Sequence, residues 1–174
     1  LEDIAPTNLE GLKNYADFTH TPMLILSAKI LGVEESGLKE LAQFYTFIGL
    51  VRAIPHHQSQ HRVMIPQDLM VKYDLKRSEF HKEAMREHLK QCVAEILTDI
   101  TPLKPKTPYF KAMHLLVSEH LKSIKKADFD PYLVDRNIKK RRFLMVLAPR
   151  PFTFNVAMPV LAWFALKLTI MPVV

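Results

Sequence analysis

The amino-acid sequence predicts an all-α domain, and three observations lead to that expectation. Apolar residues recur at spacings of three and four over most of the first 126 residues, which is the pattern of helices with one buried face. Glycine occurs only four times in 174 residues, which favours helices over a turn-rich sandwich or barrel. No alternating strand pattern and no longer internal repeat is present. The length fits a single domain with a real core.

The first two expected helices lie between Asn8 and Gly32. Asn8 precedes an apolar-periodic stretch over residues 9–19, and its side chain can cap the helix start. Pro22 then kinks this helix or restarts it as a second one over residues 23–31. Gly32 follows directly, which is typical of a helix C-terminus.

A longer helix is expected over residues 36–54. Pro55 ends it, because the residue before a proline disfavours helical geometry. One face carries apolar residues at helical spacing, and Arg52 continues that face. The apolar positions are Leu38, Leu41, Tyr45 and Ile48.

Two further helices follow, separated by a proline-rich linker. A short turn at residues 66–70 leads to a charged helix over 78–98, which Ser78 can cap. After the linker a helix is expected over 109–126, and 127–137 is loop-like. The expected buried stripes are Met85, Leu89, Cys92, Val93 and Ile96, then Phe110, Met113, Leu116, Val117 and Leu121.

The net charge of +6 is moderate, and its distribution is more informative than its size. A basic run, Lys139, Lys140, Arg141 and Arg142, stands just before an apolar C-terminal stretch. Such a run fits a solvated loop, or contact with anionic lipid or an acidic partner. The lack of interleaved aromatic residues argues against nucleic acid. The single cysteine, Cys92, excludes an internal disulfide.

The C-terminal stretch, residues 143–174, is strongly apolar, with 23 apolar residues out of 32. Its longest uncharged run, residues 151–166, contains Pro159 and is shorter than the roughly 20 residues that cross a bilayer. Three interpretations stay open: a buried core helix, an interface with protein or the membrane surface, and a true span. Each interpretation implies that residues 143–174 contact a hydrophobic environment.

Residues 51–66 carry the most informative motif of the chain. They resemble the second catalytic segment of squalene/phytoene synthases, in which Leu-Arg-Asp-x-x-x-Asp lies on a helix and Arg-x-Tyr-Leu-Pro follows. In the family the two aspartates hold magnesium ions against a substrate diphosphate. This chain keeps Arg52 but has Ala53 and His57 where the aspartates would stand. A methyl group and an imidazole cannot replace two carboxylates, because Mg²⁺ prefers carboxylate and water oxygens.

The resemblance extends over most of residues 1–130 and narrows to one branch of the superfamily. Residues 51–57 are similar to the Leu-Arg-Ala-x-Pro-Tyr-His segment of the mitochondrial complex I assembly-factor branch, and only His56 departs from it in type. Residues 62–68 and 126–130 are similar to that branch's Val-Phe-Leu-Pro-x-Asp and Val-Asp-Phe-Asp elements. Several matches in order, at compatible spacing, make the signal fairly specific.

By this resemblance the fold is an isoprenoid-synthase-like helical bundle, of which the chain holds the C-terminal half. Residues 1–142 are expected to form the squalene/phytoene synthase-like domain, and 143–174 an apolar helical segment that docks or lies near a membrane. The enzymes' first aspartate-rich motif does not occur in the sequence. We expect an upstream segment, another chain or a partner to supply the other half, and the sequence lacks an initiator methionine. A half-bundle exposes the inner stripes of its helices, so we expect large partner contacts.

The resemblance implies a non-catalytic protein without metal or cofactor. Its expected role is a scaffold that helps to assemble a mitochondrial respiratory complex, first of all complex I, or that is retained as a subunit. The expected partners are protein subunits of that complex and the inner-membrane or lipid surface, not nucleic acid. The expected location is peripheral, on the matrix side of the inner membrane. Two alternatives stay open: an active prenyl transferase whose first motif lies upstream, and an isoprenoid- or lipid-binding module.

Two arginines and the basic run are candidate anion sites. Arg52, Arg62 and residues 139–142 could contact a phosphate or a lipid headgroup, since guanidinium binds oxyanions in bidentate fashion. Alternatively, Arg52 pairs with an inward carboxylate such as Asp17.

Other polar residues favour structural roles. His56, His57 and His61 form no closed metal-ligand set, and a histidine near a helix end is favourably placed against the helix dipole. Asp128 and Asp130 are expected to cap a turn. The serines near histidines, Ser59 and Ser78, lack the flanking glycines of a nucleophile elbow.

Overall fold

The computed structural model describes residues 5–60, 62, 64–98, 100 and 103–134, without the side chain of Arg77, and the structural statements below concern these residues. They form helices and connecting turns with no strand among them, so the all-α prediction is confirmed. The basic run and the stretch 143–174 lie outside the described residues. Among the described helices, none combines the length and the apolar character needed to cross a bilayer. The elements are α1 Leu9–Thr19, α2 Thr21–Leu31, α3 Leu38–Ser59, α4 Gln67–Lys72, the 3₁₀ turn η1 Arg77–Glu79, α5 Glu83–Thr98 and α6 Pro108–Lys126.

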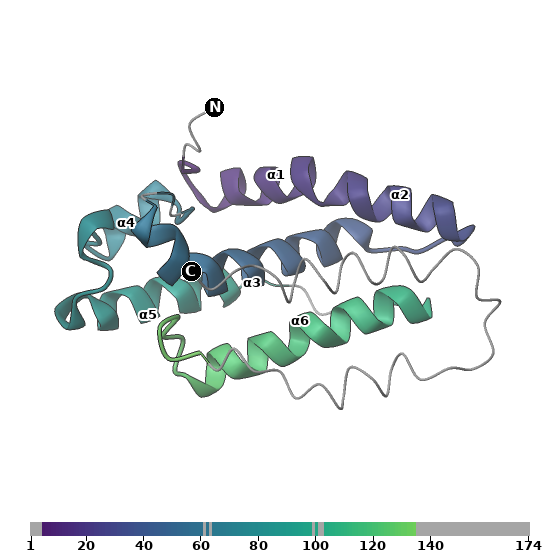
Figure 1. Ribbon diagram of the computed structural model, residues 1–174. Helices are drawn as coiled ribbons and strands as arrows, with labels where there is room; N and C mark the ends of the chain where they lie inside the picture. The colour runs from purple at the N-terminus through teal and green to yellow at the C-terminus, as the bar shows by residue number, and fades with distance from the viewer. Residues whose placement is uncertain (1–4, 61, 63, 99, 101–102, 135–174) are drawn as a thin grey trace.

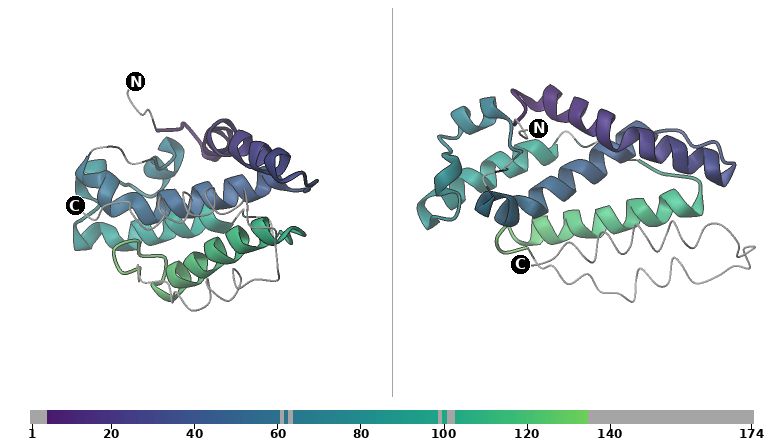
Figure 2. Two further views of the ribbon diagram at one scale, coloured as in Figure 1. Left: turned by 45° about the vertical axis from the view of Figure 1, so that its right-hand side comes forward. Right: turned by 45° about the horizontal axis from the view of Figure 1, so that its top comes forward.

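Helix α3 is the centre of the bundle. Helices α1 and α2 follow one another along one side of α3, and α6 lies along the opposite side (Figures 1 and 2). Helix α5 also contacts α3, and α4 and η1 connect the two. Because α3 is covered from several directions, most of its length contributes to the core. Its buried residues are Leu41, Ala42, Phe44, Thr46, Phe47, Ile48, Val51 and Ile54.

The core has two parts along α3. The larger part joins α1, α3, α5 and the turn after α6, and fully buried Phe47, Phe80 and Leu89 fill it. The smaller part lies toward the start of α3, where Leu24 of α2 and Phe110 of α6 pack on Leu41. Burying residues of this size stabilises a fold by roughly 1.5–3 kcal/mol each before entropy is counted. The apolar stripes predicted from the sequence therefore identified the faces of α3, α5 and α6 that point to the core.

The predicted helix ends at Asn8 and Gly32 are confirmed. The side chain of Asn8 accepts a hydrogen bond from the backbone N–H of Gly11 at 2.8 Å. Gly32 adopts the left-handed conformation with φ 63°, and the N–H of Val33 bonds to the carbonyl of Ala28 at 3.1 Å. These bonds satisfy backbone groups that a helix terminus leaves without partners.

A glycine that the sequence analysis did not single out begins α3. Gly37 has φ 74°, a region that residues with a Cβ avoid. A Cβ at this position would lie 2.4 Å from Leu103 Cδ1 in the linker before α6. Both the backbone conformation and the close packing therefore require glycine here.

The prediction that Pro55 ends the third helix is wrong. Helix α3 continues through Pro55 to Ser59. The proline removes one N–H donor, so the helix loses the bond that this group would give to the carbonyl of Val51. Val51 and Ile54 are both buried, and their packing holds the last turn in helical form despite that loss.

The prediction that Ser78 caps the charged helix is also wrong. Ser78 lies within η1, and α5 begins only at Glu83. Between them Phe80 is fully buried, so the chain makes a turn that directs this ring into the core before the helix starts. Tertiary burial of one aromatic ring overrides the local capping signal.

Candidate functional site

The degenerate motif lies in the C-terminal half of α3. Arg52, Ala53 and His57 are all half-buried. Residues 53 and 57 are one helical turn apart, so their side chains lie on the same side of α3. Neither side chain is a carboxylate. Within the described residues there is no group of three or more histidine, cysteine or acidic side chains placed to hold a metal ion.

The charge of Arg52 acts on two groups, Tyr45, earlier on α3, and His120 on α6. Burial and, to a smaller extent, the positive charge of Arg52 together lower the pKa of His120 to about 3. Burial raises the pKa of Tyr45, while the same charge opposes that shift. His120 is only 4% exposed, and its Nδ1 has no hydrogen-bond partner among the described residues. At neutral pH the groups near Arg52 therefore include a neutral imidazole and a neutral phenol.

The pairing expected between Arg52 and Asp17 is wrong. The carboxylate of Asp17, on α1, lies 2.8 Å from Lys39 Nζ and accepts a hydrogen bond from Gln43 Nε2 at 3.1 Å. Both partners lie in the first turns of α3, far along the helix from residue 52. Asp17 therefore fastens α1 to the start of α3.

A second polar contact fastens the junction of α1 and α2 to α3. Thr46, which is buried, donates its hydroxyl proton to the carbonyl of Ala42 at 2.7 Å. Its oxygen also lies 3.0 Å from Nδ1 of His20, the residue between α1 and α2. Since the Thr46 hydroxyl proton is already used, Nδ1 must be the protonated nitrogen and donates to Thr46. Thr46 therefore holds the helices together.

The histidines lie at the end of α3, as predicted. His56 and His57 are in its last turn, with ring centroids 5.9 Å apart. The carbonyl of His57 accepts hydrogen bonds from the N–H groups of Gln60 and Arg62, at 3.1 and 2.9 Å. His61 lies outside the described residues. This end of α3 is thus closed by backbone bonds of the following turn.

Of the two aspartates after α6, Asp130 caps a turn, as predicted, whereas Asp128 pairs with a lysine of α5. Asp130 is 2% exposed and accepts a hydrogen bond from the N–H of Tyr132 at 2.9 Å. Its other oxygen lies 3.2 Å from Arg86 Nε of α5, and the guanidinium of Arg86 stacks on the Tyr132 ring at 4.4 Å. Asp128 is exposed and pairs with Lys90 at 3.1 Å. The two carboxylates bind the turn to α5.

The remaining candidate residues are spread over the surface. Arg62 is exposed, and residues 139–142 are not among the described ones, so anion or lipid contact at these positions stays a prediction. The hydroxyl of Ser59 donates to the carbonyl of His56 at 2.7 Å, and Ser78 lies in η1. The structure brings Arg52, Ala53 and His57 together on α3, and the backbone of Arg62 joins the end of this segment through its bond to the His57 carbonyl.

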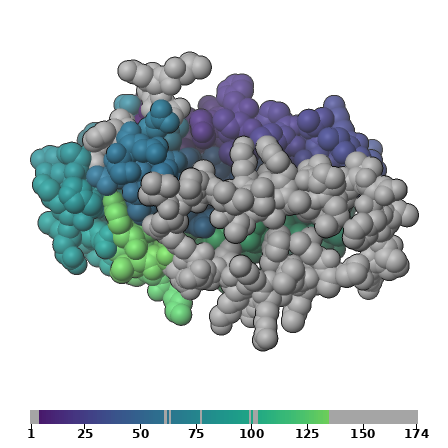
Figure 3. Space-filling model, viewed as in Figure 1, coloured from purple at the N-terminus to yellow at the C-terminus, as the bar shows by residue number. Residues whose placement is uncertain are grey.

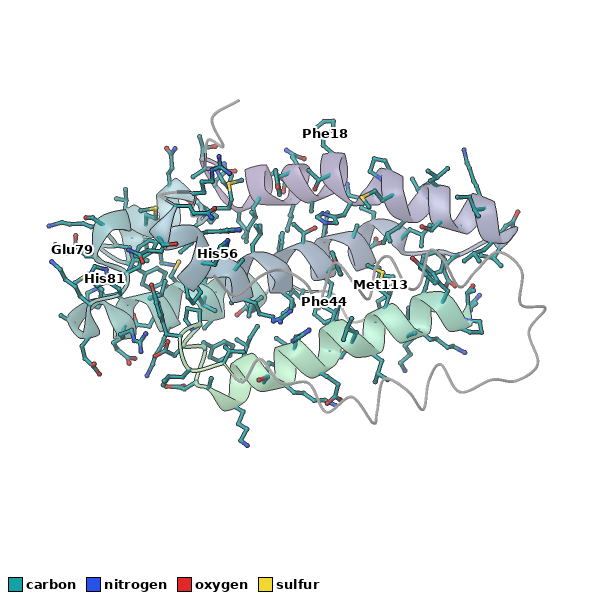
Figure 4. All side chains as sticks on the ribbon, viewed as in Figure 1. Phe18, Phe44, His56, Glu79, His81 and Met113 are labelled. Atoms are coloured by element: carbon teal, nitrogen blue, oxygen red, sulfur yellow. The ribbon has the colours of Figure 1, made fainter. Side chains whose placement is uncertain are left out.

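A cleft of about 490 Å³ lies between α5 and α6, and sequence reasoning did not identify it. Phe44 of α3 lies between α3 and α6, with its ring centroid 5.7 Å from that of His114 (Figure 4). Burial lowers the pKa of His114, so the imidazole is neutral at neutral pH. The lining is Phe44, Ala94, Leu97, Thr98, Ile100, His114, Ser118, Leu121, Lys125 and Phe129.

The outer side of α1 and α2 carries a row of exposed apolar side chains, here called the outer stripe. Phe18 is 84% exposed and Leu26 58%. The two helices run along one edge of the molecule, and Phe18 points away from the bundle (Figures 3 and 4). The outer stripe consists of Tyr15, Phe18, Ile25, Leu26 and Ile30.

Comparison with known proteins gives two findings. The family model described as squalene/phytoene synthase matches residues 1–143. The chain is also 22% identical to bovine (Bos taurus) "NADH dehydrogenase (ubiquinone) complex I, assembly factor 6" over 165 residues, which are 85% of this chain and 48% of that protein. The proteins of the same name from Homo sapiens and Rattus norvegicus are 23% and 25% identical, each over 79% of this chain and 46% of the relative. The chain thus spans about half the length of these relatives. No solved structure matches it significantly.

Proposed function

Because the chain belongs to the squalene/phytoene synthase family, we propose that it is a non-catalytic member that serves as a scaffold in the assembly of mitochondrial complex I. One observation carries the non-catalytic part. Residues 53 and 57 of α3 are alanine and histidine, and by the resemblance of residues 51–66 they stand where the enzymes of the family have their metal-binding aspartates.

The charges around this segment support the same conclusion. The enzymes need a cluster of negative charge that attracts magnesium. Here neither Ala53 nor His57 supplies a negative charge. Magnesium prefers carboxylate and water oxygens, so these two positions lack the ligands that would attract it.

The relatives support the complex I part of the proposal. All three named proteins are called assembly factors, and each matches at least 79% of this chain. The names of the relatives support a mitochondrial location with complex I components as partners, and we propose in addition that the protein is peripheral, on the matrix side of the inner membrane. The basic run 139–142 and the apolar residues 143–174 are the sequence features suited to a lipid or protein surface there.

Deletion and rescue test the scaffold role. We expect deletion of the gene to lower the amount of fully assembled complex I on native gels, with the other respiratory complexes unchanged. Reintroducing the wild-type gene should restore complex I. Normal complex I in the deletion strain would contradict the proposal.

A direct assay tests the non-catalytic part. The purified native protein is incubated with Mg²⁺ and farnesyl or geranylgeranyl diphosphate, and pyrophosphate release is measured. We expect no turnover above that of an Ala53→Leu variant, whose larger side chain blocks the same helix face. Turnover that depends on Mg²⁺ would instead favour an active prenyl transferase.

The cleft between α5 and α6 favours a second candidate, an isoprenoid- or lipid-binding module. Its volume falls in the range of roughly 300–1,000 Å³ common for small-molecule sites, and its lining is largely apolar with few polar groups. Lys125 at the cleft could pair with an anionic headgroup. Native mass spectrometry of the purified protein would reveal a retained lipid, and Leu97→Trp should displace it. A protein that is repeatedly free of lipid would contradict this candidate.

A further inference from the structure

The cleft between α5 and α6 is separate from the degenerate motif. Phe44, which lines the cleft, and Ala53 are nine residues apart on α3, which is roughly two and a half turns at 3.6 residues per turn. Their side chains therefore leave α3 on nearly opposite sides. A molecule bound in the cleft would lie on the side of α3 that faces α6, away from the positions where the enzymes of the family hold their metal ions.

One face of α6 forms a long wall of the cleft. Its lining residues follow one another at intervals of four, three and four, which places them in a single row along the helix. The row is roughly 16 Å long at 1.5 Å per residue. An elongated ligand fits such a row better than a compact one. The row consists of His114, Ser118, Leu121 and Lys125.

Apolar side chains supply most of the lining. Leu97 of α5 and Phe44 of α3 are buried, so the inner part of the cleft is continuous with the hydrophobic core. A hydrocarbon chain gains free energy on leaving water for such a surface, in proportion to the apolar area that is covered. The apolar lining residues are Phe44, Ala94, Leu97, Ile100, Leu121 and Phe129.

Phe129 contributes to the cleft wall from a costly backbone conformation. Its φ is 58°, in the left-handed region that residues with a Cβ avoid, and the preceding Asp128 has φ 52°. The N–H of Phe129 bonds to the carbonyl of Ile124 at 2.9 Å, and the ion pair of Asp130 with Arg86 fastens the same turn to α5. Strained residues held in this way are typical of ligand sites. The Phe129 ring is thus a fixed part of the wall.

The lining carries a single charge, that of Lys125. Within the described part of the chain no carboxylate pairs with this lysine. The imidazole of His114 is neutral, because burial lowers its pKa, and Ser118 is uncharged. One positive charge matches one anionic group. A diphosphate carries several negative charges and would need further cations.

We propose that the cleft binds a single-chain lipid with one anionic end, such as a long-chain fatty acid. The carboxylate pairs with Lys125, and the chain lies along Leu121 and Leu97. The proposal rests on the second candidate function, the lipid-binding module, and deepens it by naming the ligand class. It does not depend on the complex I role.

Competition binding to the purified native protein tests the proposal. The fluorescent fatty acid cis-parinarate reports occupancy, and hexadecanoate, hexadecan-1-ol and farnesyl diphosphate compete with it. We expect hexadecanoate to bind at least about threefold more tightly than hexadecan-1-ol, which has the same chain without the charge. Lys125→Gln should remove this difference. Lys126→Gln is the matched control and should preserve it, because Lys126 is also exposed but does not line the cleft.

Two alanines of α5 locate the site. Ala94 lines the cleft, whereas Ala84 is exposed at the start of the helix. Ala94→Phe fills the cleft and should abolish displaceable binding of cis-parinarate, and Ala84→Phe should leave it unchanged. Circular dichroism shows whether both variants are folded. If Ala94→Phe does not fold, the two exposed lysine variants still decide the outcome.

Three results overturn the proposal. They are the absence of displaceable cis-parinarate binding to the wild-type protein, equal affinities for hexadecanoate and hexadecan-1-ol, and binding that a folded Ala94→Phe variant retains. Tighter binding of hexadecan-1-ol or farnesyl diphosphate than of hexadecanoate refutes this ligand class and leaves the lipid-binding module standing. Assembly of complex I on native gels is measured separately, so the scaffold role stands or fails without changing this result.

Discussion

Three glycines of this chain form a graded test of the packing at the start of α3. Alanine substitution adds only a Cβ, and the surroundings of that Cβ differ in each case. At Gly37 it meets both a left-handed backbone and Leu103 Cδ1 at 2.4 Å. At Gly32 it meets the left-handed backbone alone, since no atom lies within 4 Å. At Gly49, inside α3, it meets neither constraint.

The expected changes in the free energy of unfolding follow from these surroundings. A left-handed conformation costs an alanine about 1–2 kcal/mol. Moving the end of the Leu103 side chain out of its rotamer adds about 0.5–1.5 kcal/mol. Gly37→Ala should therefore destabilise by ~1.5–3.5 kcal/mol and Gly32→Ala by ~1–2 kcal/mol. Gly49→Ala should stabilise by ~0.5–1 kcal/mol, because alanine is the better helix former.

Urea unfolding followed by circular dichroism measures all three variants. A Leu103→Ala background separates the two terms at Gly37, since it removes the clash and leaves the backbone cost. In the Leu103→Ala background, Gly37→Ala should lower the free energy of unfolding by no more than Gly32→Ala lowers it in the wild-type protein. If Gly37→Ala and Gly32→Ala are equally destabilising in the wild type, the close contact with Leu103 does not constrain the start of α3.

Three further predictions concern buried polar groups. Thr46→Val should destabilise by about 0.5–1.5 kcal/mol in urea unfolding, because Nδ1–H of His20 loses one of its two acceptors and keeps Thr19 Oγ1 at 3.0 Å. The pKa of His120, lowered to about 3 from 6.5, means that the unfolded chain binds a proton that the folded chain does not, so stability should fall by about 2 kcal/mol from pH 6.5 to pH 5. His120→Leu should remove that part of the pH dependence, and an unchanged slope would refute the assignment. Asp130→Asn should cost about 1–3 kcal/mol by taking the charge away from half-buried Arg86, whereas exposed Asp128→Asn should cost at most about 0.5 kcal/mol.

Local signals in the sequence predicted much of the fold. Asn8 and Gly32 mark helix ends by chemistry that depends only on their neighbours, so these ends were predictable. The stripe through Leu41 and Ile48 was predictable because one buried face imposes the helical period. The features decided by distant contacts were not. Packing across the bundle extends α3 past Pro55.

The candidate site was predictable in composition but not in its surroundings. The exchange at Ala53 and His57 is visible in the sequence itself. The contact of Arg52 with His120 was not, since 68 positions separate the two residues and only the packing of α3 on α6 joins them. The one available signal was a histidine between the apolar positions Val117 and Ile124. The carboxylate of Asp17 was assigned to the wrong partner for the same reason: sequence spacing does not show which end of α3 faces α1.

The anchor formed by Asp130, Arg86 and Tyr132 has a mechanical consequence. It lies just before Val134, the last residue described, and holds that point of the chain against α5. A force applied through the chain after residue 134 would act first on the buried Asp130–Arg86 ion pair and on the Tyr132 ring stacked on Arg86. Tension would then pass to α5 before it could peel α6 from the bundle. A tether attached to the C-terminal side could thus bear strain while the segment around Ala53 stays undisturbed.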